Sequence, residues 1–335
     1  MLSGLGNGGP EKKRNGGGAP EGSGAAAGDL GATLRGSVGA SFDPERYRDL
    51  NALVQRQGWN LLTAGIDFGA DPCVVDLGSG HGGNTAALAA ATRPMRSRVI
   101  GVDVSGDMVA QANKDFPISK FPNLVFLEGR AENVDAVLRA HERVRGVQLP
   151  AITHVVSNYT LHWVRDPANP DRFLHGEMFR RLNRRQDIGG EQHHLCAETE
   201  AFKELFKAGY DLIGEESRWQ EFFPLGQGGC PWRHPRLVDG AELSKALEEA
   251  GYAGTIEKRT EERVFRSDGD LTAWVGAMIR PFMERIPEDL RGDFAAGWIA
   301  RYLKDNPAMR GTDGAVKLLD RNLLVRAKKI GELAD

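Results

Sequence analysis

The sequence predicts an α/β fold in which a mostly parallel sheet carries helices on both faces. Short apolar runs alternate with amphipathic or alanine-rich segments between residues 73 and 197, which is the pattern of repeated strand–helix units. A glycine-rich turn follows the first of these apolar runs, at the place where such sheets bind ligands. With 335 residues, the chain is long enough for one large domain.

The composition is that of a soluble globular protein. It is 41% hydrophobic and 27% charged, which excludes wholesale disorder, and its three cysteines exclude a small disulfide scaffold. A net charge of −3 gives no general attraction to nucleic acid or to anionic membranes. No apolar run approaches the roughly 20 residues that a membrane helix needs. We therefore expect a cytoplasmic protein with neither a nucleic-acid nor a membrane partner.

The beginning of the chain differs from the rest. Residues 1–39 are rich in Gly, with Ala, Ser and Pro and few large apolar side chains. Such a segment buries too little surface to offset the entropy lost on ordering. It also lacks the apolar core of a secretory signal peptide. We expect a disordered tail over residues 1–39 and a folded domain over residues 40–335.

The expected elements follow in order from Ser41. The sequence Asp43-Pro44-Glu45 predicts a helix start, and apolar residues continue at helical spacing as far as Leu62. Predicted strands and helices then alternate: strands at 73–77, 99–102, 124–127, 154–157 and 194–197, and helices at 84–91, 105–114, 132–142 and 171–184.

The regular alternation ends after Glu198. Aromatic residues lie among Gly and Pro over residues 199–235, and a second aromatic-rich block covers residues 268–315. We predict that these two segments form a mainly helical lid. A further helix is expected at 242–250, and strands at 255–265 and 323–327 are expected to complete the sheet.

The glycine-rich stretch VVDLGSGHGGNT carries the chemistry. Gly78, Gly80 and Gly83 match GxGxxG, the fingerprint of nicotinamide-binding folds, so a dehydrogenase is one alternative. However, Asp76 stands two residues before the first glycine, where its carboxylate would face a pyrophosphate unfavourably. The same carboxylate suits a cationic ligand, and S-adenosylmethionine carries both an ammonium and a sulfonium. We expect Asp76, Gly78, Ser79 and Gly80 to bind this cofactor.

A second acid follows the next predicted strand. Asp103 stands where an acid accepts hydrogen bonds from both ribose hydroxyls of a nucleoside ligand. The alternative is a cap for the following helix, but Ser105 already serves that role. Val104, next in the chain, belongs to the same expected cofactor contact.

The pair of stretches VVDLGSGHGG and VIGVDVSGDM resembles the class I S-adenosylmethionine-dependent methyltransferases. The resemblance implies their Rossmann-like, seven-stranded, mostly parallel sheet with strand order 3-2-1-4-5-7-6, and S-adenosylmethionine as cofactor. Arg130 stands where that family usually has an aspartate beside the adenine, so the backbone of Arg130 and Ala131 is expected to serve the adenine. Asn158, after the fourth strand, is placed in the same cofactor site.

The stretch SNYTLHW, from Ser157 to Trp163, resembles the "SxxxLHW" segment of the juvenile hormone acid methyltransferases. Trans-aconitate and malonyl-carrier-protein carboxyl methyltransferases carry close variants. Two further segments resemble the juvenile hormone acid group: Tyr47–Gln55 its N-terminal helix "YxxxNxLQ", and Ile279–Pro287 its C-terminal lid helix. No Pro-Pro pair follows the fourth strand, which disfavours methylation of nucleic-acid amino groups. The resemblance implies carboxyl methylation of a small acid.

A carboxylate acceptor is ionised at neutral pH and needs no general base. Trp163 would then supply an indole donor and an apolar wall, and Gln55 or Gln57 an amide donor. His162 has two interpretations: a general base for a phenol or an amine, or a ring that braces the loop, and we favour the second. A protein that binds the cofactor without turnover is a further alternative.

The aromatic-rich lid segments favour an apolar or terpenoid acid as acceptor. A compact tricarboxylate would need several cationic partners, for which the candidates are Arg233, Arg236 and Arg280. Three possible zinc ligands alternate on one strand face, but no second pair of ligands accompanies them, so we predict no metal site. The three are His194, Cys196 and Glu198.

Overall fold

The computed structural model describes residues 55–198, 202–223, 238–279, 283 and 285–333. The tail expected over residues 1–39 and the first part of the helix expected from Asp43 therefore lie outside the described residues, whereas residues 55–63 are helical as expected. So do part of the first lid segment, with Arg233 and Arg236, and Arg280 of the second. Within the described ranges, no helix is long and apolar enough to cross a membrane.

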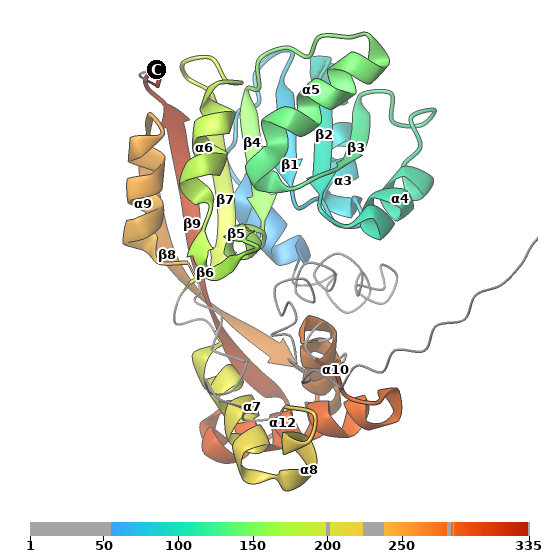
Figure 1. Cartoon of the computed structure of the whole chain (residues 1–335), viewed down its shortest axis with the longest axis vertical. Coiled ribbons are helices and arrows are strands. Elements are labelled where there is room, and N and C mark those ends of the chain that lie inside the picture. Colours follow the sequence, from blue (N-terminus) through green and yellow to red (C-terminus); the bar gives the residue numbers. More distant parts are fainter. Residues whose placement is uncertain (1–54, 199–201, 224–237, 280–282, 284, 334–335) are drawn as a thin grey trace, which may run out of the picture. The chain divides into compact units, whose positions relative to one another are not determined.

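A seven-stranded sheet forms the centre of the fold, in the order β3-β2-β1-β4-β7-β9-β8 (Figure 1). The first five strands in this order pair in parallel, whereas β9 pairs antiparallel with both β7 and β8. The strands are β1 (Cys73–Leu77), β2 (Arg98–Asp103), β3 (Leu124–Glu128), β4 (His154–Asn158), β7 (Glu191–Ala197), β8 (Tyr252–Phe265) and β9 (Val316–Lys329). Numbered along the chain within this sheet, the order is the predicted 3-2-1-4-5-7-6, so the predicted fold class is confirmed.

Both faces of the parallel part of the sheet are covered by helices. Every residue of β1 is buried, as expected where successive side chains meet a helical layer on each side. Val75 and Ile100 lie in one hydrophobic core, and Val74 and Val99 lie in another. The first core includes residues of α5 (Val134–Arg145), α6 (His175–Asn183) and α9 (Gly240–Glu249), and the second includes residues of the helix at 55–63, α3 (Gly83–Thr92) and α4 (Gly106–Asp115).

Local signals set several element ends. Ser105 accepts a hydrogen bond from Met108 N at 3.3 Å, which confirms the predicted cap of α4. The helix predicted over 171–184 is wrong at its start, because residues 165–173 form the hairpin β5 (Arg165–Asp166) and β6 (Asn169–Phe173), with the Arg165 guanidinium 4.5 Å from the Phe173 ring centroid. The last strand is also longer than the predicted 323–327: buried and exposed positions alternate over 316–321 and 326–329, on either side of the fully buried stretch Asn322–Val325.

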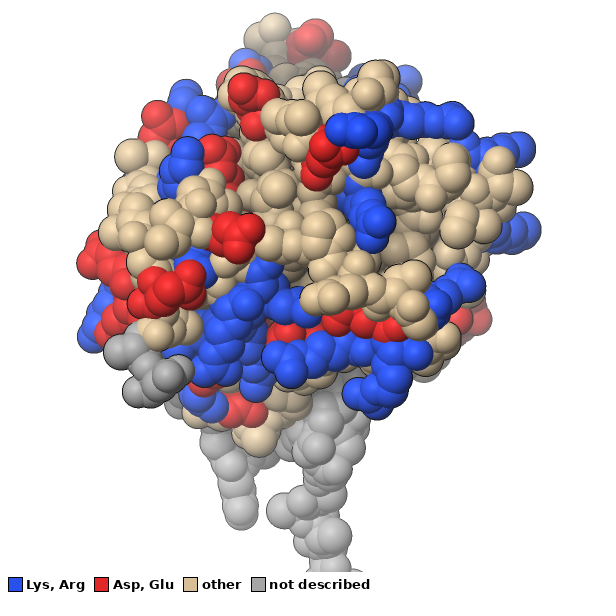
Figure 2. Space-filling view, turned by 90° about the horizontal axis from the view of Figure 1, so that it is seen from above, with Lys and Arg blue, Asp and Glu red and all other residues tan. Residues whose placement is uncertain are grey.

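The edge at which the parallel strands begin carries charges of both signs. Figure 2 shows Lys and Arg side chains beside Asp and Glu side chains on this face. Ion pairs there join Arg96 to Asp71 at 2.7 Å and Lys328 to Glu191 at 3.5 Å. Exposed pairs of this kind contribute little to stability. In a parallel α/β sheet, ligands bind at the opposite edge, where the strands end.

A second group of helices has its own hydrophobic core. Val316 and Leu318, at the start of β9, are buried in this core, and β8 contacts α10 (Figure 1). The long β8–β9 ribbon therefore connects the sheet to these helices, which we call the cap. The cap consists of α7 (Lys203–Glu215), α8 (Ser217–Gln220), α10 (Asp268–Met278) and α12 (Arg291–Asp305).

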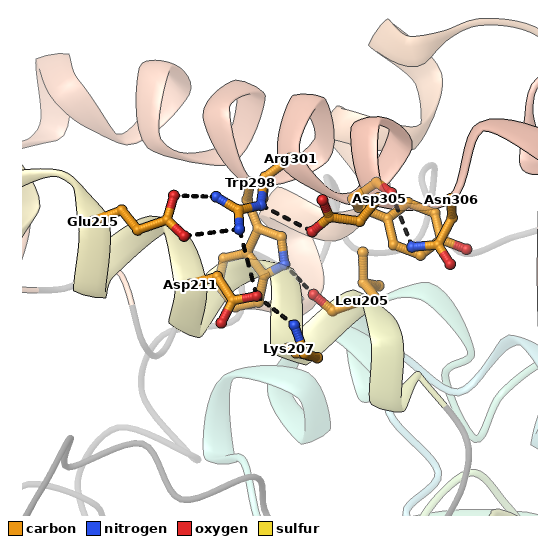
Figure 3. Close-up of polar contacts among 9 residues, drawn as sticks. Leu205, Lys207, Asp211, Glu215, Trp298, Arg301, Asp305 and Asn306 are labelled. Atoms are coloured by element: carbon orange, nitrogen blue, oxygen red, sulfur yellow. Dashed lines mark hydrogen bonds and ion pairs between the residues drawn. The ribbon is translucent and has the colours of Figure 1, made fainter.

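Helices α7 and α12 approach each other closely. The Trp298 indole of α12 donates a hydrogen bond to the Leu205 carbonyl of α7, and an added Cβ on Gly209 would lie 2.2 Å from the Trp298 ring. Figure 3 shows Arg301 of α12 reaching across to Glu215 of α7, with which it forms a bidentate ion pair. Because that pair is near the surface, the packing of Trp298 on Gly209 is expected to dominate the stability of the contact.

We predict that Gly209→Ala destabilises the protein by about 1–3 kcal/mol, because the new methyl group forces α7 and α12 apart. Gly214→Ala is the matched control, since no atom lies within 4 Å of its added Cβ on the same helix. There the higher helix propensity of Ala should stabilise the chain slightly. Urea unfolding followed by circular dichroism measures both, and equal effects of the two substitutions would contradict the close-packing argument.

Candidate functional site

The turn between β1 and α3 is built on glycines in the left-handed region of backbone space. Gly78 has φ +74°, Gly80 has φ +55° and Gly82 has φ +85°. Side chains are also sterically excluded, since an added Cβ on Gly78 would lie 1.9 Å from Thr160 Oγ1. The turn after β1 therefore packs directly against the turn after β4, and both lie at the edge where the parallel strands end.

Asp103 ties the turn after β2 to this glycine turn. Its Oδ2 accepts a hydrogen bond from Gly80 N at 2.8 Å, and its Oδ1 accepts one from Ser105 N at 2.9 Å. Burial raises the pKa of Asp103, while these backbone donors lower it. Val104 beside it is 41% exposed, which leaves an apolar surface next to the carboxylate.

Asp76 lies beneath the glycine turn and is only 2% exposed. Its Oδ2 accepts a hydrogen bond from Thr85 Oγ1 at 2.6 Å, a partner in α3 that the sequence analysis did not identify. Burial, together with the nearby Asp103 carboxylate, raises the pKa of Asp76 to about 7, and the Thr85 hydrogen bond opposes this shift. Asp76 is therefore poised between its two protonation states near neutral pH.

Polar groups in and beside the glycine turn are available to bind a ligand. The hydroxyl oxygen of Ser79 is buried and has no hydrogen-bond partner among the residues that the structure describes. Helix α3 begins at Gly83 without a side-chain cap, so no side chain satisfies its first N–H groups. A buried polar atom without a partner requires an explanation, and a bound polar ligand supplies one. These residues fit the charged amino-acid end of S-adenosylmethionine, and Asp103 with Val104 fits its nucleoside end.

The turn after β4 carries the residues predicted for the acceptor. Asn158 Nδ2 donates a hydrogen bond to the Gln55 carbonyl at 3.3 Å, so the structure brings the 55–63 helix against the end of β4. Gln57 is exposed on the same helix. Residues Leu161–Trp163 form a short 3₁₀ turn in which Trp163 is 39% exposed.

His162 lies beside Trp163, with 5.1 Å between the ring centroids. Burial and the nearby Arg165 lower the pKa of His162 to about 3, so its ring is neutral at physiological pH. Its Nδ1 has no hydrogen-bond partner. The bracing contact comes instead from His175, whose Nε2 is 2.8 Å from the Leu161 carbonyl. The sequence analysis missed His175 because this contact joins the start of α6 to a turn 14 residues earlier, and so depends on how the two elements pack.

The Arg130 side chain is turned away from a direct role with the adenine. Its Nε pairs with Glu132, and its Nη2 donates to the Arg165 carbonyl at 3.0 Å. The side chain thus links the turn after β3 to the segment after Trp163. The backbone of Arg130 and of Ala131, at the start of a 3₁₀ turn, remains the part that we assign to the adenine.

The possible zinc ligands on β7 are engaged elsewhere. His194 Nε2 is 2.9 Å from Gln192 Oε1, and Glu198 pairs with Lys258. Burial raises the pKa of the Cys196 thiol, which favours its neutral form. Over the residues that the structure describes, no group of three or more His, Cys, Asp or Glu side chains is placed to hold a metal ion.

Comparisons with known proteins agree with this geometry. Residues 74–184 match a family model described as a methyltransferase domain. Juvenile hormone acid O-methyltransferase of Drosophila melanogaster is 26% identical over 230 residues, which cover 68% of this chain and 70% of that protein. Trans-aconitate 2-methyltransferase of Azoarcus sp. (strain BH72) is 27% identical over 267 residues, covering 78% and 88%.

A solved structure supports the fold. The YcgJ protein of Bacillus subtilis superposes with a TM-score of 0.51 at 16% identity, over 82% of this chain and 99% of that chain. The matched domain model begins in β1 and runs through α6, so it spans the glycine turn, Asp103 and the turn after β4. The domain match and the strand order together indicate an S-adenosylmethionine-dependent methyltransferase with the class I fold, to which the two relatives are similar at 26% and 27% identity.

Proposed function

We propose that this methyltransferase transfers the methyl group of S-adenosylmethionine to the carboxylate of a small acid. The observation that carries the proposal is the low pKa of His162, the candidate base of the SNYTLHW segment, whose side chain is partly buried with its Nδ1 inside the protein. A ring with a pKa of about 3 is poorly matched to proton abstraction at neutral pH, and a carboxylate acceptor needs none. The names of the two relatives, each of an enzyme that acts on an acid, support the same acceptor class.

On this proposal, the carboxyl edge of the sheet divides into two parts. Asp103 accepts hydrogen bonds from the ribose, and Asp76 balances the ammonium of the cofactor. The remaining cofactor contacts come from Gly78, Ser79, Gly80, Val104, Arg130, Ala131 and Asn158. When bound, S-adenosylmethionine supplies a methyl carbon activated by its sulfonium. The protein then needs chiefly to aim the acceptor oxygen at that carbon and to exclude water.

Trp163 and Gln55 are proposed to act on the acceptor side. The Trp163 indole is a donor and an apolar wall, and its exposure at the end of β4 leaves it accessible to a ligand. Gln55 is held near by the contact between its carbonyl and Asn158. We further propose an apolar or terpenoid acid, because an exposed indole and valine at this edge favour an acceptor with apolar surface.

Label transfer tests the reaction class. Incubation with methyl-labelled S-adenosylmethionine and a panel of juvenile hormone acid, fatty acids, trans-aconitate, phenols and amines should label acids. The label should be released as methanol by mild alkali, as a methyl ester requires. Alkali-stable label on a phenol or an amine would contradict the proposal and assign His162 as base. Cofactor binding without any transfer would instead support a non-catalytic binding protein.

Two neighbouring substitutions separate the roles in the turn. Trp163→Ala should lower kcat/KM for the acid by about tenfold or more, because it removes both a donor and a wall. His162→Gln should change it less than about threefold, since a neutral ring is already present at pH 7. Initial rates with both variants measure this, and cofactor affinity serves as the control. A larger loss in His162→Gln than in Trp163→Ala would reverse the assignment.

Asp76 should make cofactor binding depend on pH. Its raised pKa means that the folded chain holds a proton that the unfolded chain has lost, so the carboxyl group costs stability as pH rises from about 4 to 7. Contact with the ammonium favours the ionised form, and affinity should therefore rise about tenfold from pH 6 to pH 8.

Calorimetric titration with S-adenosylmethionine measures this dependence. In Asp76→Asn, the rise of affinity with pH that comes from this carboxyl group should disappear. Only the pH dependence that comes from titration of the ligand itself should remain. Asp71→Asn, at the opposite edge of the sheet, is the matched control and should keep the slope of the unsubstituted protein. If cofactor affinity changed with pH in the same way in all three proteins, the proposed contact between Asp76 and the ammonium would be wrong.

A further inference from the structure

Tyr159, the residue that follows β4, adopts an unusual backbone conformation. Its φ is +58°, in the left-handed region that a bulky side chain seldom occupies. The conformation redirects the chain from the end of β4 into the turn that carries His162 and Trp163. Surrounding structure must hold a residue in such a region, and residues of this kind cluster at functional sites.

Three side chains hold the Tyr159 hydroxyl. It donates to Asp320 Oδ2 at 3.0 Å, and it accepts from Arg263 Nη2 at 2.9 Å and from Asn322 Nδ2 at 3.1 Å. Arg263 and Asp320 also form an ion pair with each other. The Arg263 side chain is 7% exposed and that of Asp320 is 0% exposed, so the phenol completes a buried network.

All three partners lie on the ribbon that connects the sheet to the cap. Arg263 is in β8, and Asp320 and Asn322 are in β9, where the pairing of β9 with β7 ends at Asn322. Residues 316–321 continue toward the cap paired with β8 (Figure 1). The network therefore sits where the ribbon leaves the parallel part of the sheet.

Arg263 also contacts the cap directly. Its guanidinium carbon lies 5.5 Å from the Tyr159 ring centroid and 5.3 Å from that of Trp274, in helix α10. One side chain thus touches both the turn after β4 and the core of the cap. A buried guanidinium between two rings is strongly restrained, because cation–π contacts strengthen when they are desolvated.

We propose that Tyr159 is a positioning residue through which the cap-bearing ribbon fixes the turn that orients the methyl acceptor. The inference rests on the proposed acceptor role of Trp163. On this proposal, the Tyr159 phenol contacts neither S-adenosylmethionine nor the methyl acceptor. It holds the strained backbone at Tyr159, and the ribbon in turn holds the phenol. Movement of the cap relative to the sheet would then be transmitted to the turn through Arg263 and Asp320.

Tyr159→Phe removes the hydroxyl and keeps the ring. The matched control is Tyr252→Phe, because Tyr252 is a buried tyrosine whose hydroxyl is likewise held by side chains, but far from the turn after β4. Its hydroxyl donates to Gln186 Oε1 at 2.7 Å and accepts from Gln192 Nε2 at 3.2 Å. Tyr252 is the first residue of β8, at the end of the sheet where the parallel strands begin. A purely structural hydroxyl predicts similar effects of the two substitutions.

Hydrogen–deuterium exchange of the full-length protein gives a readout that needs no acceptor. The amides of Trp163 and Val164 are protected by bonds to the Thr160 and Leu161 carbonyls. We expect their exchange to speed up at least tenfold in Tyr159→Phe, with a parallel rise at residues 316–321 and no change in Tyr252→Phe. Asn322→Ala, which removes one partner, should raise exchange in the same two segments by a smaller factor and serves if Tyr159→Phe fails to fold.

Steady-state kinetics of Tyr159→Phe test the effect on methyl transfer. With the acid that gives the fastest alkali-labile labelling, Tyr159→Phe should lower kcat/KM at least tenfold, while the Kd for S-adenosylmethionine stays within threefold. The proposal would be overturned if amide exchange at residues 160–164 were unchanged in Tyr159→Phe, or if it rose equally in Tyr252→Phe. Because exchange is measured without an acceptor, that result is distinguishable from a failure of the carboxyl methylation proposal, in which exchange responds as expected but no acid is labelled.

Discussion

The hydrogen bond from Gly80 N–H to Asp103 Oδ2 holds together the two turns on which the cofactor site depends. It is possible only because β1 and β2 are parallel neighbours, so that their carboxyl ends meet at one edge. It also requires backbone with positive φ at Gly80, which presents the N–H toward the neighbouring strand. The same edge gathers the turn after β4, since β1 pairs on its other side with that strand. The sheet therefore assembles cofactor and acceptor residues from segments far apart in the chain.

The electrostatics of this edge suit the proposed carboxyl methylation, in which no general base is needed. The two acids near the glycine turn have raised pKa values, because burial opposes their charge, and a cationic cofactor would restore it. On the acceptor side, His162 is held neutral by burial and by the nearby Arg165. A carboxylate brings its own negative charge to the sulfonium and needs neither base nor metal. Transfer then depends on orientation and exclusion of water, which rigid turns supply.

Local patterns were sufficient to predict the features that are local in sequence. The glycine turn, the acid after β2, the cap at Ser105 and the strand–helix alternation can all be recognised within short windows, and the strand order follows from the family resemblance. Contacts across long separations were not predictable in this way. The Thr85 hydroxyl on Asp76, the His175 bond to the Leu161 carbonyl and the Tyr159 contact with Asp320 each depend on how elements pack. The hairpin at 165–173 was missed because it depends on contacts between its two strands, namely the antiparallel pairing of Arg165 with Phe173 and the stacking of the Arg165 guanidinium on the Phe173 ring.

The length of β8 and β9 has a mechanical consequence. In the parallel part of the sheet β1 and β4 are short, five-residue strands that are buried almost throughout. The antiparallel pair instead runs 14 residues in each strand, and its far end is buried in the cap core at Val316 and Leu318. A continuous ladder of this kind is stiff along its length, so it transmits the position of the cap to the sheet rather than absorbing it. The pairing of β9 with β7 ends at Asn322. Near this point the buried Arg263–Asp320 pair contacts Tyr159, whose φ is positive, in the turn after β4.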